Sequence, residues 1–419
     1  MSPPRPVRRV LILVENLPVP FDRRVWMEAL TLREAGYEVS VICPKGKGYE
    51  KEYEEIHGIH IYRYSLPEEG RSAKSYLREY ALALWHTWRL SWRVLRERGF
   101  DVIHACNPPD LFFLVGLPFK LWGKRFLFDH HDLNPELYEA KFGRRDIFYR
   151  LLLLLERLTF MAADVVIATN ESYREVALTR GRKRPDQVFV VRSGPRLHQF
   201  KPVSPNPMFK RGRRYLVGYV GVMGEQDGVD YLLRAVREIV HTHGRRDVHF
   251  VLIGSGPMFN DLQRMAGELA IKEFVEFTGR VPDNELLARL STCDVCVNPD
   301  PLNPLNDKST MNKILEYMAL GKPIVQFDLL EGRRSAGEAS LYATPNSPSD
   351  LARLILELLD DEPRRHSLGR EGRRRIEEEL AWEHQAPKLL AAYKYLFGCD
   401  VPGKQASPDH RLAKKTFTG

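Results

Sequence analysis

The chain has 419 residues, more than one hydrophobic core usually organises, and at roughly 100–200 residues per domain it is expected to form two domains or three. Hydrophobic residues make up 43% of the chain and aromatic residues 10%, which excludes a protein that is disordered throughout. The formal net charge of +8 favours acidic partners, such as nucleotide phosphates, anionic lipid or nucleic acid, without choosing among them.

Short apolar strands alternate with longer helical patterns over the first 200 residues. A helix is expected at 23–35, ended by Gly36. The strands of this half are expected at 9–14, 37–43, 60–64, 102–105, 125–129, 165–168 and 188–192. Such alternation is typical of βαβ units in a mostly parallel sheet, which binds ligands outside the carboxyl ends of its strands.

The pattern breaks at 201–214, where three prolines in seven residues precede a basic run, as in a linker. A second series of strands is then expected at 216–221, 249–253, 275–277, 295–298, 324–327 and 341–343. The predicted organisation is a domain at 1–200, the linker, a domain at 215–380, a helix at 381–398 that packs back on the first domain, and a flexible tail at 399–419. Two similar halves joined in this way place a cleft between them.

The cysteines and the N-terminus bear on the cellular environment. The five cysteines are scattered and form no disulfide framework for a chain of this size. Cys293 and Cys296 form a CxxC in a strand-like run without a second ligand pair, so we interpret them as buried strand residues rather than a metal or redox site. The first residues have no apolar signal core, and no apolar run reaches the roughly 18–20 residues that span a bilayer. We therefore expect a soluble, cytoplasmic protein.

The most informative stretch is 298–323, where a Pro- and Asn-rich loop leads from a strand into a helix expected at 312–320. Ser309 and Thr310 are expected to cap this helix. The start of a helix after a parallel strand offers unpaired N–H groups and the positive end of a dipole to a phosphate.

Three charged side chains accompany this helix. Lys308 and Lys313 would add positive charge near a phosphate, and Glu316, one turn in, would accept both hydroxyls of a ribose. An ordinary capped helix with Glu316 solvated, or paired with a lysine, explains the same spacing equally well. The two interpretations stay open on spacing alone.

The residues 316–323, EYMALGKP, resemble the nucleotide-sugar site of retaining glycosyltransferases with the GT-B fold, in glycosyltransferase family four. The loop at 16–26 resembles that of a bacterial polysaccharide-type subgroup, and the resemblance covers about residues 8–397. It implies an α/β fold of two Rossmann-like parallel-sheet domains facing a central cleft. It also implies that Glu316 holds the ribose, that the preceding loop cradles the diphosphate, and that the nucleotide-sugar is a substrate, with no cofactor and no metal.

The sequence departs from the family pattern at two places. Lys308 stands eight positions before Glu316, where the family has a glutamate that contacts the donor sugar, and Asp307 is a candidate substitute. The family commonly has an Arg and a Lys in the loop that here reads 221–228, which is glycine-rich but acidic. Our hypothesis is that Lys308 and Lys313 supply the missing countercharge and stabilise the leaving phosphate.

Other family-like loops follow successive strands in the expected order. The loop at 254–257 matches the family's G-x-G-P loop, and the turn at 279–282 is one that packs against the base in the family. The residues that the resemblance implies for donor binding are Glu316, Asp307, Ser309, Thr310, Asn312, Gly221, Gly224, Gly254, Gly256, Arg280 and Val281.

The N-terminal half is expected to hold the acceptor. Phe21, Asp22, Arg23 and Arg24 lie at the carboxyl edge of its sheet, where a salt-bridge cluster at the helix start is an equally good interpretation. The run at 128–136 contains two histidines between two aspartates. The family places a histidine here beside the donor sugar, which implies His131 with Asp132 as catalytic residues; a buried structural histidine is the alternative, and a metal site lacks further ligands.

The segment at 74–98 has three tryptophans, Trp85, Trp88 and Trp92, at helical spacing beside a basic face. Packing of the tryptophans on the sheet is the simpler interpretation, and contact with an inner-leaflet membrane surface is the alternative. The segment at 141–160 is similarly basic and then strongly apolar. Membrane contact would make a lipid-linked saccharide acceptor the expected substrate.

The sequence predicts a retaining glycosyltransferase that moves a hexose-type sugar from a nucleotide sugar, a UDP-sugar in our interpretation, to a saccharide or lipid-linked acceptor in the synthesis of cell-surface polysaccharide or glycoconjugates. The alternative is a non-catalytic nucleotide-sugar-binding or scaffold protein of the same fold. Nucleic acid is not an expected partner, because the basic residues are dispersed and match no recognition motif.

Overall fold

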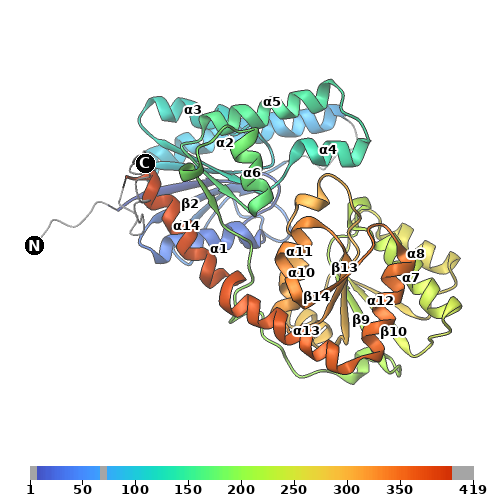
Figure 1. Ribbon diagram of the computed structural model, residues 1–419. Helices are drawn as coiled ribbons and strands as arrows, with labels where there is room; N and C mark the ends of the chain where they lie inside the picture. The colour runs from blue at the N-terminus through green and yellow to red at the C-terminus, as the bar shows by residue number, and fades with distance from the viewer. Residues whose placement is uncertain (1–6, 67–72, 399–419) are drawn as a thin grey trace, which may run out of the picture.

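The computed structural model describes residues 7–66 and 73–398, which form two α/β domains side by side (Figure 1). The strands of the N-terminal domain are β1 (Arg9–Leu13), β2 (Glu38–Pro44), β3 (Tyr53–Ile56), β4 (Ile59–Tyr64), β5 (Val102–Cys106), β6 (Arg125–His130), β7 (Val165–Ala168) and β8 (Val188–Val190). Within the described residues they form one sheet in the order β3-β4-β2-β1-β5-β6-β7-β8. Every neighbouring pair is parallel except β3 with β4.

The second sheet belongs to the C-terminal domain. Its strands are β9 (Tyr215–Val220), β10 (Val248–Ile253), β11 (Val275–Gly279), β12 (Val295–Asn298), β13 (Ile324–Phe327) and β14 (Ser340–Ala343). They are parallel in the order β11-β10-β9-β12-β13-β14. The predicted α/β class with two Rossmann-like parallel-sheet domains is confirmed.

Helices cover both faces of each sheet. Those of the N-terminal domain are α1 (Arg23–Glu34), α2 (Ala73–Glu97), α3 (Phe113–Leu121), α4 (Asn134–Phe142), α5 (Ile147–Ala162) and α6 (Glu171–Thr179). Those that follow are α7 (Val229–Arg237), α8 (Phe259–Glu268), α9 (Asp283–Thr292), α10 (Asn312–Ala319), α11 (Leu330–Ala336), α12 (Pro348–Asp360), α13 (Glu362–Arg375) and α14 (Trp382–Leu396). No helix in the described part of the chain combines the length and apolarity needed to cross a bilayer.

Alternation along β1 shows why the sheet needs both layers. Leu11 and Leu13 belong to a core cluster with side chains of α2 and α3, whereas Val10 and Ile12 belong to a cluster with side chains of α1 and α14. Successive side chains of a strand point to opposite faces, so an apolar strand needs cover on both. The one strand that the sequence analysis did not predict, β3, is an edge strand with the sequence YEEI, too polar to give this signal.

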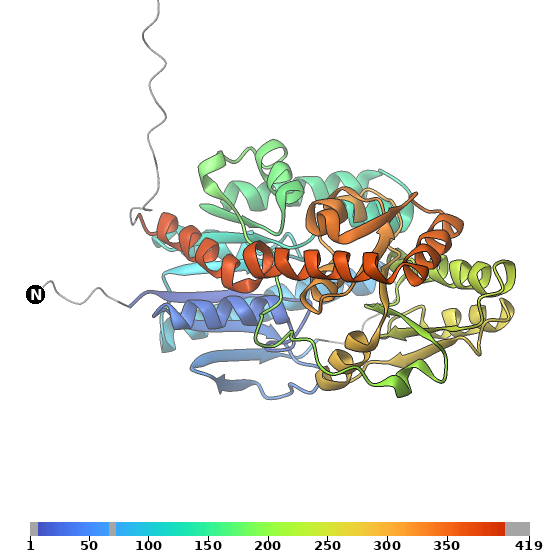
Figure 2. The ribbon, with the colours of Figure 1, turned by 60° about the horizontal axis from the view of Figure 1, so that its bottom comes forward.

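The last helix, α14, crosses from the C-terminal to the N-terminal domain (Figures 1 and 2). The indole Nε1 of Trp382 donates to Thr31 Oγ1 of α1 at 2.9 Å, and the Tyr393 hydroxyl lies 2.8 Å from Nδ1 of His104. Leu389 is fully buried between them in the core cluster of α1. The helix therefore closes one face of the N-terminal sheet with residues from the far end of the described chain.

The segment predicted as a linker runs along α9. The N–H groups of Val203 and Asn206 donate to hydroxyls of Ser291 and Thr292, and Lys210 pairs with Asp294. The segment predicted as a tail, 399–419, lies outside the described residues.

Leu389→Ala is expected to lower the free energy of unfolding of the N-terminal domain by about 2–5 kcal/mol, because it opens a cavity beneath α14. Urea denaturation of the whole chain measures this change. Lys394→Ala, at an exposed position of the same helix, is the control. An equal loss in both variants would contradict the conclusion that burial of Leu389 against the sheet stabilises α14.

Candidate functional site

The first turn of α1 meets the C-terminal domain. Arg23 Nη1 lies 3.3 Å from Glu316 Oε1, and Arg23 Nη2 donates to Asp283 Oδ1 at 2.8 Å. Beside them the guanidinium of Arg280 stacks over the ring of Phe21, 4.1 Å from its centroid. The predicted acceptor loop and three residues of the opposite domain are thus in direct contact across the domain interface.

Glu316 lies on the wall of a cleft of about 60 Å³ between the domains. The residues that line it are Arg23, Arg24, Met27, Ser193, Gly194, Pro195, Arg196, Gln199, Phe200, Asn312 and Glu316. The Glu316 side chain is 17% exposed, and burial raises the pKa of its carboxyl, an effect that Arg23 opposes. A carboxylate, two side-chain amides and three guanidinium groups therefore line one cleft.

Arg196 and Phe200 of this cleft were not found by sequence analysis. They lie in the irregular stretch between β8 and the Pro-rich segment, where no motif marks them. Only their place in the chain could have indicated them, because a segment that leaves the last strand of a parallel sheet starts at the carboxyl edge of that sheet.

The helix that carries Glu316 begins differently from the prediction. Met311 is the N-cap residue of α10, and no side chain caps the helix, so the prediction that Ser309 and Thr310 cap it is wrong. The Ser309 hydroxyl instead donates to the Leu305 carbonyl and lies 3.2 Å from the Tyr173 hydroxyl. The backbone N–H groups in the first turn of α10 therefore have no capping side chain as acceptor.

Loop 305–310 is held by the start of α6 from the other domain. Asn170 Nδ2 donates to the Lys308 carbonyl at 2.8 Å and to Thr310 Oγ1 at 3.0 Å, and Arg192 donates to the same Thr310 oxygen at 3.3 Å. Glu331 of α11 accepts from both the N–H and the hydroxyl of Ser172. Ser309 and Thr310 thus use their hydroxyls to fix the domains to each other.

The two lysines of this region each form an ion pair with a carboxylate. Lys308 Nζ lies 3.1 Å from Glu136 of the N-terminal domain. Lys313 donates to both oxygens of Asp300, at 3.0 and 2.9 Å, in a buried pair; burial lowers the pKa of Lys313, but Asp300 raises it above its ordinary value. Each lysine thus faces a carboxylate in this structure, and the hypothesis that Lys308 and Lys313 supply countercharge to a diphosphate stays a prediction.

Asp307, the candidate substitute for the missing glutamate, accepts a hydrogen bond from the N–H of Leu330 at 2.8 Å. This contact satisfies the first N–H of α11. Asp307 is thus turned toward α11, and the expectation that it replaces a sugar-binding glutamate has no support in this contact.

The predicted glycine loops lie against each other at the ends of β9 and β10. Gly254 has φ +133°, and a Cβ there would collide with the carbonyl of Gly221. A Cβ at Gly256 would likewise collide with the backbone of Met223, and the Gly224 N–H donates to Asp227 Oδ2. Burial raises the pKa of Asp227 to about 6, which the nearby Lys313 opposes. The loop is acidic, as the sequence indicates, and Lys313 is its neighbouring cation.

Arg24 occupies the centre of a buried charge cluster. Its guanidinium lies 2.8 Å from Asp129 Oδ1 and 3.1 Å from Glu28 Oε1, and its Nη1 donates to the Val191 carbonyl. Burial raises the pKa of Asp129, but Arg24 and His131 outweigh it and hold that pKa well below its usual range. Asp22 caps α1 by accepting from the Val25 N–H. For Arg24 and Asp22 the salt-bridge and capping interpretation fits these contacts better than acceptor binding.

His131 belongs to the same cluster. Its Nε2 lies 2.5 Å from Asp129 Oδ2 and 2.8 Å from Arg24 Nε, and the ring is 13% exposed. The neighbouring Asp132 has a pKa raised by burial, which His131 opposes. Asn107 fixes this turn by accepting from the N–H groups of both His131 and Asp132. The cluster therefore orients His131 firmly.

The ligand atoms of Glu28, Cys106, Asp129 and His131 lie within 4.8 Å of one another, as in a metal site. Arg24 already contacts both carboxylates of this group at ion-pair distance. A cation would have to displace the guanidinium, so the donor set fits a metal ion poorly.

The tryptophans of α2 divide between core and surface. Trp88 and Trp92 pack on Phe119, whereas Trp85 is 59% exposed. More exposed apolar side chains lie on α3 and α5, which contact each other at the top of Figure 1. Those on these helices and at the end of α3 are Leu114, Leu117, Leu121, Trp122, Ile147, Phe148, Leu151, Leu154 and Met161.

Arg24→Ala is expected to destabilise the protein by about 3–5 kcal/mol, because it leaves Asp129 and Glu28 buried without their counterion. Arg23→Ala removes a half-exposed ion pair and is expected to cost no more than about 1 kcal/mol. Urea denaturation of the two variants measures the difference. Equal destabilisation would contradict the assignment of Arg24 to the buried cluster.

The comparisons with known proteins cover both domains. Residues 22–194 match the model described as glycosyl transferase 4-like domain, and residues 214–361 match glycosyl transferases group 1. Over 393 residues the chain is 25% identical to the MMP alpha-(1->4)-mannosyltransferase of Mycolicibacterium hassiacum, covering 87% of this chain and 91% of that one. It is 27% identical over 185 residues to a 2-deoxystreptamine glucosyltransferase of Streptomyces kanamyceticus, which covers 44% of this chain and 46% of that relative.

Solved structures share the fold along nearly the whole chain. Sucrose-phosphate synthase from Thermosynechococcus elongatus superposes with a TM-score of 0.78 at 20% identity, covering 93% of this chain and 99% of that one. HepE from Anabaena, solved in complex with UDP and glucose, gives 0.70 at 15% identity, with 93% and 100% covered. Since both domains match glycosyltransferase families and the whole chain has their fold, this chain belongs to the GT-B glycosyltransferases of the family-four type.

Proposed function

We propose that the protein transfers a sugar from a nucleotide-sugar donor to a saccharide or lipid-linked acceptor, with retention at the anomeric carbon. The observation that carries the proposal is the position of Glu316, whose buried carboxylate lies in the interdomain cleft beside Asn312 and opposite Arg23. A carboxylate in such a place suits the two hydroxyls of a ribose. The N–H groups at the start of α10 and the close-packed loops at Gly221 and Gly254 suit the adjoining diphosphate.

The countercharge in this proposal comes from arginine. Lys313 is neutralised by Asp300, whereas Arg23 and Arg196 line the cleft that contains Glu316. A guanidinium donates two parallel hydrogen bonds to a phosphate and keeps its charge at every physiological pH. Arg23 would then exchange its ion pair with Glu316 for the donor's phosphates. Because these cations can stabilise the leaving diphosphate, the proposed reaction needs neither a metal ion nor a cofactor.

Retention follows from a reaction on the front face of the donor. The bond between the anomeric carbon and the diphosphate oxygen breaks through an oxocarbenium-like state, and the departing phosphate takes the proton of the acceptor hydroxyl. In this step His131, oriented by Asp129, would lie beside the donor sugar. The UDP that accompanies glucose in HepE supports a UDP-sugar as the donor, and the family supports a role in polysaccharide or glycoconjugate synthesis.

A non-catalytic nucleotide-sugar-binding protein is the second candidate. Lys308 occupies the position of the glutamate that contacts the donor sugar in the family, and it pairs with Glu136 across the interface. Such a protein would bind nucleotide and sugar nucleotide without turnover. Release of nucleoside diphosphate from a panel of UDP-, GDP- and ADP-sugars separates the two candidates, and tight binding without release would favour the second.

Glu316→Gln is expected to weaken nucleoside diphosphate binding about tenfold, since an amide accepts the two ribose hydroxyls less well than a carboxylate. Calorimetric titration with UDP, and with GDP and ADP in parallel, measures the affinity. Asp283→Asn is the matched control, because Asp283 also pairs with Arg23 but is exposed on α9. Its affinity is expected to stay within about twofold of the unsubstituted protein. An unchanged affinity in Glu316→Gln would remove the basis of the proposal.

We further propose that the apolar surface of α3 and α5 lies on an anionic membrane, which fits a lipid-linked acceptor. Phe148 is 55% and Leu151 47% exposed, and the exposed cations Arg144, Arg145 and Arg150 lie next to them in the chain. Apolar side chains that enter the headgroup region beside cations are typical of interfacial helices. Arg144 and Arg145 also pair with Asp146 and Glu139, and anionic lipid would add further complementary charge beside them.

Phe148→Ser combined with Leu151→Ser is expected to reduce binding to phosphatidylglycerol-containing vesicles about tenfold, measured by co-sedimentation. Met208→Ser, at an exposed apolar position of the 201–214 segment, is the control. Binding should also weaken as ionic strength rises, because the cations are exposed. Vesicle binding that does not depend on salt, or an equal loss of binding in the control, would contradict the proposal that this surface contacts the membrane.

A further inference from the structure

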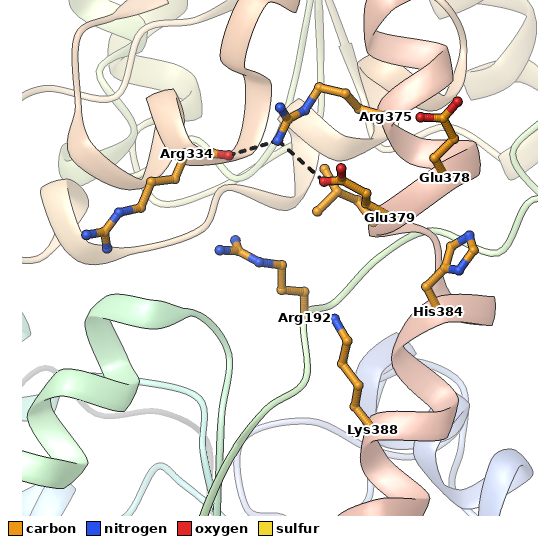
Figure 3. Close-up of a pocket in the computed structure, with 8 residues that line it drawn as sticks. Arg192, Arg334, Arg375, Glu378, Glu379, His384 and Lys388 are labelled. Atoms are coloured by element: carbon orange, nitrogen blue, oxygen red, sulfur yellow. Dashed lines mark hydrogen bonds and ion pairs between the residues drawn. The ribbon is translucent and has the colours of Figure 1, made fainter. Parts of the chain in front are cut away.

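A second cavity, of about 480 Å³, lies where the end of β8, the helix α11 and the α13–α14 crossing meet (Figure 3). Among the described residues it shares no lining side chain with the cleft that contains Glu316. The segment after β8 separates the two, with Arg192 lining this cavity and 193–196 lining the cleft. The cavity is therefore distinct from the proposed donor site.

Positive charge dominates its lining. In the described part of the chain, four cations and two carboxylates contribute: Arg192, Arg334, Arg375, Lys388, Glu378 and Glu379. Figure 3 shows Arg375 entering from one side of the cavity and Lys388, with Arg192, from the opposite side. Glu378 is already paired with Arg374, which is not part of the lining, at 2.5 Å.

These cations are incompletely satisfied. Arg375 donates from Nη2 to the Arg334 carbonyl at 3.2 Å and lies 4.0 Å from Glu379, but its buried Nε has no hydrogen-bond partner among the described residues. Partial burial of its ammonium group lowers the pKa of Lys388, and repulsion from Arg192 lowers it further. Arg192 and Arg334 share one carboxylate, Glu331, at 3.6 and 2.7 Å. Like charges are thus held close together, an arrangement that a bound dianion would stabilise.

We propose that this cavity binds a phosphorylated sugar, with the phosphomonoester between Arg192, Arg375 and Lys388. A phosphomonoester carries nearly two negative charges at neutral pH and accepts the forked hydrogen bonds of guanidinium groups. The volume is in the range of small-molecule sites and leaves room for more than phosphate. The Glu379 carboxylate and Nδ1 of His384, whose Nε2 donates to the Glu377 carbonyl, supply acceptors for sugar hydroxyls on the same lining.

Arg192 connects the cavity to the loop that precedes α10. Its Nη1 donates to Thr310 Oγ1 at 3.3 Å, and α10 carries Asn312 and Glu316 into the interdomain cleft. A ligand that draws the Arg192 guanidinium toward itself weakens its contacts with Thr310 and Glu331. If α10 binds nucleotide as the proposed function requires, the ligand would change the affinity for nucleotide. Nucleotide would change the affinity for the ligand by the same factor.

Calorimetric titration of the full-length protein with glucose 6-phosphate, inorganic phosphate and glucose tests the site. Glucose 6-phosphate should bind, inorganic phosphate should bind more weakly, and glucose should not bind. Lys388→Gln, at an exposed position with a single hydrogen bond to Gln385, should weaken glucose 6-phosphate binding about tenfold. Lys394→Gln, exposed on the same helix, should leave it unchanged. Arg375→Gln is the second variant and should act like Lys388→Gln.

The remaining outcomes separate this site from the donor site. Glu316→Gln should retain glucose 6-phosphate binding while its affinity for UDP falls, and an equal fall in both affinities would place the phosphate in the donor cleft and overturn the proposal. Equal affinity for inorganic phosphate and glucose 6-phosphate would overturn the assignment to a sugar. Undiminished binding of glucose 6-phosphate in both Lys388→Gln and Arg375→Gln would overturn the proposal that this cavity is its binding site. Failure of UDP to bind the unsubstituted protein would contradict the proposed function without affecting this site.

Discussion

The arrangement of this molecule depends on the contact between Arg23 and Glu316 across the two domains. A carboxylate at the bottom of a narrow cleft is costly to keep charged unless a cation from the other wall faces it. Arg23 supplies that cation from the first turn of α1, which follows the first strand of the sheet. The ion pair therefore joins the two domains at the place where a nucleotide is proposed to bind. A ligand that brings its own hydroxyls and phosphates can replace both halves of the pair.

Two consecutive arginines in this turn have different surroundings. Arg23 is half exposed and contacts the other domain, whereas Arg24 is buried between Asp129 and Glu28 and holds the turn with His131 in place. Near the start of α10 in the C-terminal domain, two lysines also pair with carboxylates. Lys313 neutralises Asp300, and Lys308 neutralises Glu136. Arg23 and Arg196 of the N-terminal half line the cleft that contains Glu316, whereas the lysines beside α10 do not line it.

The connecting segment after β8 links the cleft to the second cavity. Arg196 lines the cleft beside Glu316, Arg192 lines the cavity beside α14, and Gly194 between them allows the backbone to pass against the Leu380 carbonyl, where a Cβ would collide. Loop 305–310 contacts the same region through Thr310. A change on one side of this segment therefore has a direct physical route to the other side, through packed and hydrogen-bonded groups.

The sequence by itself determined the two parallel sheets, because uninterrupted apolar strands alternating with helices need cover on both faces. It also determined the family, through the run from Glu316 to Pro323 and the glycine loops that precede it. It could not decide which charges are free: the partners of Lys308 and Arg192 lie in the other domain, far away in the chain, and Asp300 reaches Lys313 only because the loop after β12 folds back. It also missed Arg196 and the cavity beside α14. Those are made by packing between distant segments, and the energy of a charge depends on the neighbours that packing brings to it.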